Sequence, residues 1–256
     1  PVVTMPRKAQ RDIAAAFGVS PTWIPPRASV QTLADRMSRD GTALRQGEES
    51  VWVSMPLTVH RRCDDPMFSL CNEMAYDGMM VSAVHRRLDD PEHPDLFDGP
   101  DGEPRIPVSQ WLDMPATTPG THLQDDQIAR LCRLLDDLGD RGVAASEMIA
   151  ISPFRVVADK LESLARRYPG LRGGTIHTAQ GREADVVFLV LGGDPGAPGA
   201  KAWASSTVNL VNVAASRAKR RLYVIGDRAA WAPYPYFNGL AAALGRQPGA
   251  APEAGG

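Results

Sequence analysis

Two short segments of the chain gather residue types that suit contact with phosphate or sugar groups. The first runs from Thr175 to Asp185 and holds hydroxyl and amide side chains, a glycine and a charged pair in one short stretch. Hydroxyl and amide groups bond to phosphate and sugar oxygens, and a glycine lets the backbone approach a ligand closely. The alternative is a turn whose polar groups satisfy only its own backbone, which is the commoner situation for a loop taken alone.

The second segment, Asn209–Arg221, is an apolar helical stretch that ends in a basic cluster directly before a strand. Lys219, Arg220 and Arg221 are explained equally well as cations that stabilise a helix C-terminus through its dipole. Arg217 differs from them, because small residues flank it and leave its guanidinium room to reach a partner. Arg217 is therefore the basic residue of this segment that we expect to contact a ligand.

The elements around these segments predict an α/β fold. Short apolar runs without alternation are separated by stretches with helical spacing, which is typical of a mainly parallel sheet covered by helices on both faces. Ligands of such sheets bind at the carboxyl ends of the strands, so we expect the polar segments to gather at that edge. The expected strands are 50–55, 148–151, 175–177, 185–191 and 222–225, and the expected helices cover 29–39, 66–76, 123–138, a stretch ending near 167, and 206–218.

The same patterns divide the chain into three parts. Residues 1–50 are expected to be a lead-in segment, in which Ser29 caps a helix. Residues 51–246 are expected to form the main domain, with an Asp-, Pro- and Gly-rich loop or hairpin insertion at about 89–120. The tail, 247–256, is rich in Gly, Pro and Ala and is expected to be disordered.

Together, the polar segments resemble motifs IV, V and VI of superfamily 1 helicases, in the branch of the nonsense-mediated-decay and Dna2-type helicases. Motif VI of that branch, N-V-A-[LIV]-[ST]-R-A-[KR] before an apolar strand, is similar to Asn212–Lys219 followed by Leu222–Gly226. Ser152-Pro153-Phe154 stands in the place of motif IV. Motif V, T-x-x-[ST]-x-Q-G-x-E, is matched by Thr175, Thr178, Gln180, Gly181 and Glu183.

A stretch further upstream, His60–Cys63 with Pro66, resembles the Y-R-[MC]-H-P motif that the family carries between motifs III and IV. Arg62 is the better match to the motif arginine, because a Cys or Met follows that arginine in the family. Arg61 stands in place of the tyrosine, and Asp64-Asp65 in place of the histidine. Whether Arg61 or Arg62 faces the nucleotide stays open at this point.

By resemblance, the chain is the second, C-terminal RecA-like motor domain of a helicase, with the three-layer fold of P-loop NTPases. ATP and Mg²⁺ would bind between it and an N-terminal RecA-like domain of the same protein, which supplies the P-loop lysine and the Mg²⁺ ligands. Arg217 would be an arginine finger on the γ-phosphate, and Arg62 a second phosphate contact. The other implied site residues are Gly181, Arg182 and Glu183 at the nucleotide, and Ser152, Thr178, Gln180 and Ser216 on single-stranded nucleic acid, with Gln180 also linking the two sites.

The Walker motifs themselves are missing from this sequence. It holds no G-x-x-x-x-G-K-[ST] and no Gly-Lys pair. Leu134–Asp137 resembles a Walker B end only superficially, because its spacing is that of a surface helix. We therefore expect the chain alone not to hydrolyse ATP. Because the chain opens on Pro1 with no leading methionine, we also expect it to be a fragment of a longer protein.

The amino-acid composition limits which binding partners and which cellular compartment we expect for the protein. A net charge of −2 argues against a polybasic protein that holds nucleic acid by bulk charge, although a groove can still be locally basic. DNA is favoured over RNA as the single-stranded partner, because the sequence carries no obvious RNA-specific appendage. Three cysteines without a C-x-x-C pair predict reduced thiols, a cytoplasmic protein and no zinc or other metal site. No apolar run approaches the ~20 residues that cross a bilayer.

Two other classes of protein compete with a motor domain. A nucleic-acid-binding module descended from a helicase would no longer hydrolyse ATP, and it would have no physical need for Arg62, Glu183 and Arg217. A stand-alone nuclease would need carboxylates clustered at strand ends, whereas Asp89-Asp90 and Asp125-Asp126 lie in a loop and at a helix start. A serine hydrolase would need G-x-S-x-G, which is absent from the sequence.

Overall fold

The computed structural model describes residues 5–25, 28–46, 49–54, 56–179, 181–206 and 208–248. The chain divides into two compact units, Pro1–Thr58 and Val59–Gly256. This division falls eight residues after the 50/51 boundary expected from the sequence. The residues that resemble helicase motifs all belong to the second unit.

The first unit contains helices and one small antiparallel sheet. Its elements are α1 (Arg7–Phe17), a 3-10 helix at Pro21–Trp23, α2 (Val30–Met37), β1 (Thr42–Gln46) and β2 (Glu49–Val53). Ser29 caps α2 as the sequence predicts, since its hydroxyl accepts a hydrogen bond from the Thr32 backbone N–H at 3.1 Å. The residues expected to be a lead-in segment thus fold into regular elements.

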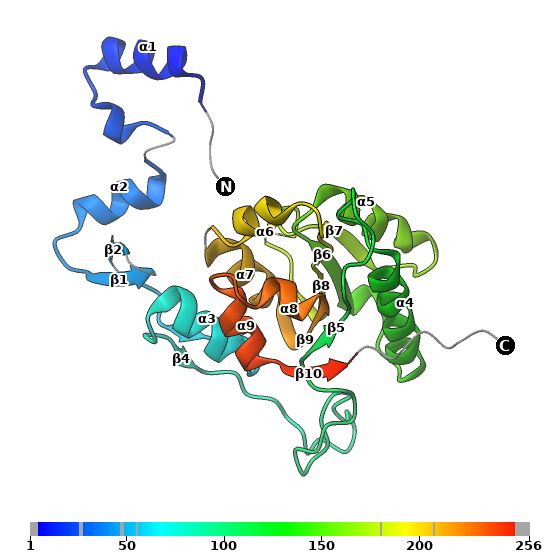
Figure 1. Ribbon diagram of the computed structural model, residues 1–256. Helices are drawn as coiled ribbons and strands as arrows, with labels where there is room; N and C mark the ends of the chain where they lie inside the picture. The colour runs from blue at the N-terminus through cyan, green and yellow to red at the C-terminus, as the bar shows by residue number, and fades with distance from the viewer. Residues whose placement is uncertain are drawn as a thin grey trace. The chain divides into compact units, whose positions relative to one another are not determined.

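A six-stranded parallel sheet forms the centre of the second unit (Figure 1). Its strand order is β10-β5-β9-β8-β6-β7, and every pair of neighbours runs parallel. The predicted α/β class with a mainly parallel sheet is therefore confirmed. The strands are β5 (Gln110–Asp113), β6 (Met148–Ser152), β7 (Arg172–Thr175), β8 (Ala184–Val190), β9 (Ala218–Gly226) and β10 (Gly245–Pro248).

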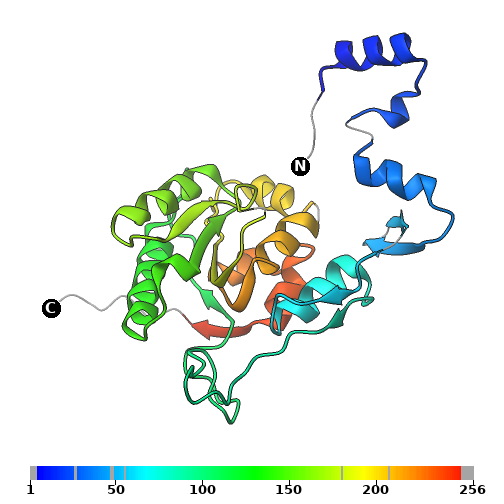
Figure 2. The same cartoon turned by 180° about the vertical axis from the view of Figure 1, so that it is seen from behind.

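Helices cover both faces of this sheet, and Figure 2 shows the same layers from behind. On one face, α4 (Asp125–Asp140) packs on β8 and β9, while α5 (Arg155–Ser163) packs on β6 and β7. Gly173 permits the close approach of α5, because a Cβ there would lie 2.4 Å from the Leu161 carbonyl carbon. On the other face, α7 (Val208–Ala215) packs on β8 and β9, with α3 (Met67–Tyr76) against it. The remaining elements of the unit are β3 (Val59–His60), β4 (Val81–Ser82), α6 (Pro198–Ala204), α8 (Arg228–Trp231), α9 (Phe237–Ala243) and 3-10 turns at Ala145–Glu147 and Leu164–Arg166.

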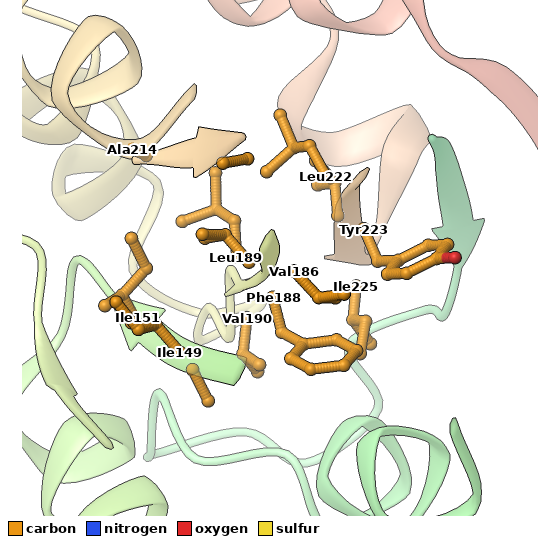
Figure 3. Close-up of a cluster of buried hydrophobic side chains, with 14 of the residues drawn as sticks. Ile149, Ile151, Val186, Phe188, Leu189, Val190, Ala214, Leu222, Tyr223 and Ile225 are labelled. Carbon is orange, nitrogen blue, oxygen red and sulfur yellow. The ribbon is translucent and has the colours of Figure 1, made fainter. Parts of the chain in front are cut away.

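The core lies on both faces of the central strands, which explains why their sequences are continuously apolar. Figure 3 shows side chains of β6, β8 and β9 packed into one cluster. Phe188 and Tyr223 are fully buried neighbours in this cluster, with ring centroids 5.7 Å apart. Strands with two buried faces form a rigid platform, so the loops at their ends are held in fixed positions.

The element boundaries differ from the sequence expectation in four places. β7 ends at Thr175, so Ile176 lies in the turn that follows it. β9 begins at Ala218, which places Lys219–Arg221 in a strand instead of at a helix C-terminus. The range 89–120, expected to be an insertion, contains β5 of the central sheet and one isolated bridge between Asp98 and Pro104. β10 reaches Pro248, and the rest of the predicted tail lies outside the described residues.

Within the described part of the chain, no helix has both the length and the apolar character needed to cross a membrane.

Candidate functional site

The residues that resemble helicase motifs are divided between the two ends of the sheet strands. Thr175 is the last residue of β7, at its carboxyl end. Glu183 and Arg217, by contrast, directly precede β8 and β9, whose first residues, Ala184 and Ala218, are paired in the sheet. The expectation that all polar segments gather at the carboxyl edge is therefore wrong. The short segment from Thr175 to Glu183 instead leads from the carboxyl end of β7 to the amino end of β8.

An ion pair between Arg62 and Glu183 marks the amino-end site. The Arg62 Nε lies 2.6 Å from Glu183 Oε2, and the two side chains are 39% and 45% exposed. Arg62 Nη1 also donates to the Ser216 carbonyl at 3.4 Å, which brings this guanidinium to the residue before Arg217. Arg61 is exposed. Of the two arginines left open by the sequence, the structure thus places Arg62 in the cluster.

Arg217 is half-buried and is held by backbone and side-chain acceptors. Its Nε donates to the Val213 carbonyl at 3.2 Å and its Nη1 to the Arg182 carbonyl at 3.1 Å. Its Nη2 donates to the Ser216 hydroxyl at 3.1 Å. Burial lowers the pKa of Arg217, and the positive charge of Arg62 lowers that pKa further. Two guanidinium groups therefore repel each other here, and an anion placed between them would relieve that repulsion.

The Glu183 carboxylate partly neutralises the positive charges of Arg62 and Arg217. Besides Arg62, it faces Lys219, whose Nζ lies 3.9 Å from Glu183 Oε1 and 3.5 Å from Asp185 Oδ1. Glu183 stands in a surface turn in which Arg182 is also exposed. Arg62, Arg217 and Lys219 together outnumber the carboxylates Glu183 and Asp185 by one charge, and this local excess of positive charge suits a phosphate group.

The turn before Glu183 depends on a glycine. Gly181 has a φ of +83°, in the left-handed region that side chains disfavour, although a Cβ at this position would meet no neighbour within 4 Å. The backbone of Glu183 is anchored from β7, because Arg172 donates from one Nη2 to the carbonyls of Glu183 and Ser146 at 3.1 and 3.2 Å. This loop is thus held through its backbone, while the side chains of Arg182 and Glu183 stay exposed.

The residues expected to contact nucleic acid do not form one group. Thr178 is exposed beside the carboxyl end of β7, and its hydroxyl donates to the Thr175 carbonyl at 2.9 Å. Ser152 has no exposed surface, and its hydroxyl accepts from the Phe154 backbone N–H at 3.3 Å. Ser152 therefore shapes the turn after β6 and is out of reach of a ligand in this conformation. Ser216 lies with Arg217 at the amino ends of the strands, and Gln180 lies outside the described residues.

Sequence reasoning missed a buried ionic cluster beside this site. Arg220 and Arg221, 7% and 6% exposed, extend from β9 toward carboxylates far away in the sequence. Arg220 Nη1 lies 2.6 Å from Asp95 Oδ2 and its Nη2 lies 3.0 Å from Asp98 Oδ2, while Arg221 also pairs with Asp98. The guanidinium of Arg220 stacks over the Phe97 ring, 4.7 Å from its centroid. Sequence spacing carries no signal for such pairs, because 120 or more residues separate the partners.

Neither the cysteines nor any group of metal-binding side chains forms a further candidate site within the described ranges. Burial raises the pKa of both Cys63 and Cys71 to about 12, so both thiols are protonated near neutral pH. All three cysteines are free thiols. Among the residues that can be placed, no group of three His, Cys, Asp or Glu side chains is arranged to hold a metal ion.

The fold and the cationic cluster define an α/β domain of the nucleotide-binding helicase type. The chain belongs to the AAA domain family, whose model matches residues 36–229. The match runs from α2 to α8 and covers every motif discussed above. A search of curated proteins found no match to the chain.

Proposed function

We propose that this chain is the second motor domain of an ATP-dependent helicase of superfamily 1, in the nonsense-mediated-decay and Dna2-type branch. In this proposal it contributes Arg217 and Arg62 to an ATP site that an N-terminal RecA-like domain of the same protein completes. One observation carries the proposal. Arg62 and Arg217, which are distant in sequence, meet around Glu183 at the amino ends of β8 and β9.

The chemistry of two adjacent guanidinium groups suits phosphoryl transfer. Each group presents several N–H donors in a fixed plane and spreads its charge over phosphate oxygens. An arginine finger of this kind contributes about 10³- to 10⁵-fold to the rate. Mg²⁺, held by the other domain, would neutralise charge on the β- and γ-phosphates. The residues of this chain fit the phosphates, while the P-loop and metal ligands must come from elsewhere.

Glu183 gives the proposed site a means of sensing the nucleotide. Its carboxylate pairs with the Arg62 guanidinium at 2.6 Å. A γ-phosphate carries more negative charge than one carboxylate, so it would compete for the same guanidinium. Gly181 and Arg182 would then lie beside the nucleotide, because the Arg182 carbonyl already accepts from Arg217.

The proposed contact with nucleic acid lies at the carboxyl ends of the strands, at the other end from the arginines. Thr178 is exposed there, and a hydroxyl can contact the phosphate backbone without reading sequence.

We favour single-stranded DNA over RNA as the partner and the cytoplasm, where free thiols persist, as the compartment. Closure on ATP would move this domain relative to the N-terminal domain by a hinge motion.

The proposal is tested by comparing ATP hydrolysis by this chain with hydrolysis by its full-length parent. The parent is expected to hydrolyse ATP faster when single-stranded DNA is present, whereas the isolated chain shows no turnover above the buffer control. Turnover by the isolated chain that survives a further purification step would overturn the proposal. A parent that binds single strands but never hydrolyses ATP would instead identify a non-hydrolysing nucleic-acid-binding module.

A further inference from the structure

Asp64, two residues after Arg62 in the same loop, contacts two arginines. Its Oδ1 accepts from Arg86 Nε at 3.0 Å, and its Oδ2 lies 2.9 Å from Arg220 Nε. The Asp64 side chain is 21% exposed, and that of Arg220 is 8% exposed. Asp64 thus accepts a hydrogen bond from Arg86 and lies in ionic contact with Arg220, so its charge links the segments that carry the two arginines.

The same contacts attach the backbone around Arg62 to the start of β9. Arg86 Nη2 donates to the carbonyl of Arg62 at 3.0 Å and to that of Lys219 at 3.4 Å. The Asp64 backbone N–H donates to the same Lys219 carbonyl at 2.8 Å. Lys219, two positions after Arg217, is therefore bonded directly to the backbone of Asp64 and is linked through Arg86 to the backbone of Arg62.

Arg220, the second arginine that Asp64 contacts, is held in the interior of the domain. Arg220 is paired with Asp95 and Asp98 and stacked on Phe97, so its guanidinium has little freedom. Arg62, in contrast, has a long side chain that is 39% exposed. A long exposed side chain keeps a defined position only if its backbone is fixed. The buried cluster supplies that fixed point through Asp64.

We propose that Asp64 is a positioning residue that, through Arg86 and Arg220, holds Arg62 beside Arg217 for phosphate contact. This inference rests on the proposed function and adds a residue to it. Asp64 acts on geometry alone, since its carboxylate pairs with Arg86 and Arg220 and leaves Arg62 to Glu183. A misplacement of about 1 Å at a site of this kind costs about 10²-fold in rate.

A double-mutant cycle in the full-length parent tests the inference. Single-strand-stimulated ATP turnover is measured for the wild type, Asp64→Asn, Arg62→Ala and the double variant. Asp64→Asn is expected to lower kcat by about 10- to 100-fold in the wild-type background. It is expected to have little further effect once Arg62 is alanine, because the group that it positions is gone. Asp64→Glu, which keeps the charge, is expected to recover part of the loss.

Controls separate positioning from a loss of stability. Tyr223→Phe removes a hydrogen bond to the Pro107 carbonyl and none of the contacts around Arg62, so it is expected to lower stability more than kcat. All variants are assayed at a temperature where circular dichroism shows them folded, and Arg86→Met replaces Asp64→Asn if the latter does not fold. Equal losses in both backgrounds, or no loss at all, would overturn the inference while leaving the proposed function intact. An Arg62→Ala variant with full activity would overturn the role of Arg62 and this inference together.

Discussion

Replacing Arg217 with alanine is expected to lower the ATP turnover of the full-length parent by about 10³-fold or more. The reason is that its guanidinium, half-buried and next to Arg62, would stabilise the charge that develops on the γ-phosphate. ATP itself should still bind, because in the proposed arrangement the P-loop contacts would come from the N-terminal domain. Turnover at saturating single-stranded DNA and the dissociation constant for ATP are measured together.

Matched variants show whether this loss is specific. Arg217→Lys keeps the charge but loses the planar donor set, and it is expected to recover little of the activity. Arg167→Ala removes a surface arginine that is 61% exposed and pairs with Asp136 far from this cluster in the fold. It is expected to leave turnover unchanged. If Arg217→Ala retains turnover within a few-fold of the wild type, the motif VI assignment is wrong.

Replacing Arg220 with alanine is expected to have the largest effect on stability, lowering the free energy of unfolding by about 3–5 kcal/mol. The substitution leaves Asp95 without its buried cation and leaves Asp98 with Arg221 alone, and it also removes the Arg220 guanidinium from the Phe97 ring. Urea unfolding of this chain measures the change. Arg155→Ala, which removes an exposed helical ion pair with Asp159, is the matched control and should change stability by about 0.5 kcal/mol or less.

The pH dependence of unfolding gives this prediction a second readout. Burial tends to raise the pKa of Asp95, but the hydrogen bonds from Arg220 and from nearby backbone N–H groups outweigh it and lower that pKa to about 2. A carboxyl with a lowered pKa stabilises the fold above its ordinary value of 3.8, and that stabilisation is lost as the pH falls toward 2. The deficit of Arg220→Ala should therefore shrink as the pH falls below about 4. A deficit that stays constant down to pH values near 3 would mean that Asp95 is not its main partner.

The central strands could be predicted from the sequence because burial on both faces leaves a continuous apolar run. β6 and β8 begin and end within a residue or so of the prediction for this reason. β5 was not predicted, since it has only four residues and lies in a stretch rich in turn-forming residues. Short edge elements such as β10 depend on tertiary contacts that a local pattern does not contain.

The site could be predicted in part. Motif residues pointed to Arg62, Glu183 and Arg217, and the structure brings these three together. Their position at the amino ends of the strands could not be predicted, because a motif does not say on which side of a strand boundary each residue falls. Ser152 was expected to contact nucleic acid, but it is fully buried, because the last residue of a strand can still be covered by the turn that follows it. The partners of Arg220 are distant in sequence, so only the fold reveals them.

The most direct test of a shared ATP site is the affinity of the parent protein for two ligands, ADP alone and ADP with fluoroaluminate. The second ligand mimics the phosphoryl group in transfer, which only a guanidinium at the γ-phosphate position should recognise. We predict that Arg217→Ala weakens binding of ADP with fluoroaluminate by about 100-fold or more and changes ADP affinity by only a few-fold. Equal affinity of the wild type and Arg217→Ala for both ligands would contradict the account, because Arg217 would then not contact the transferred phosphate.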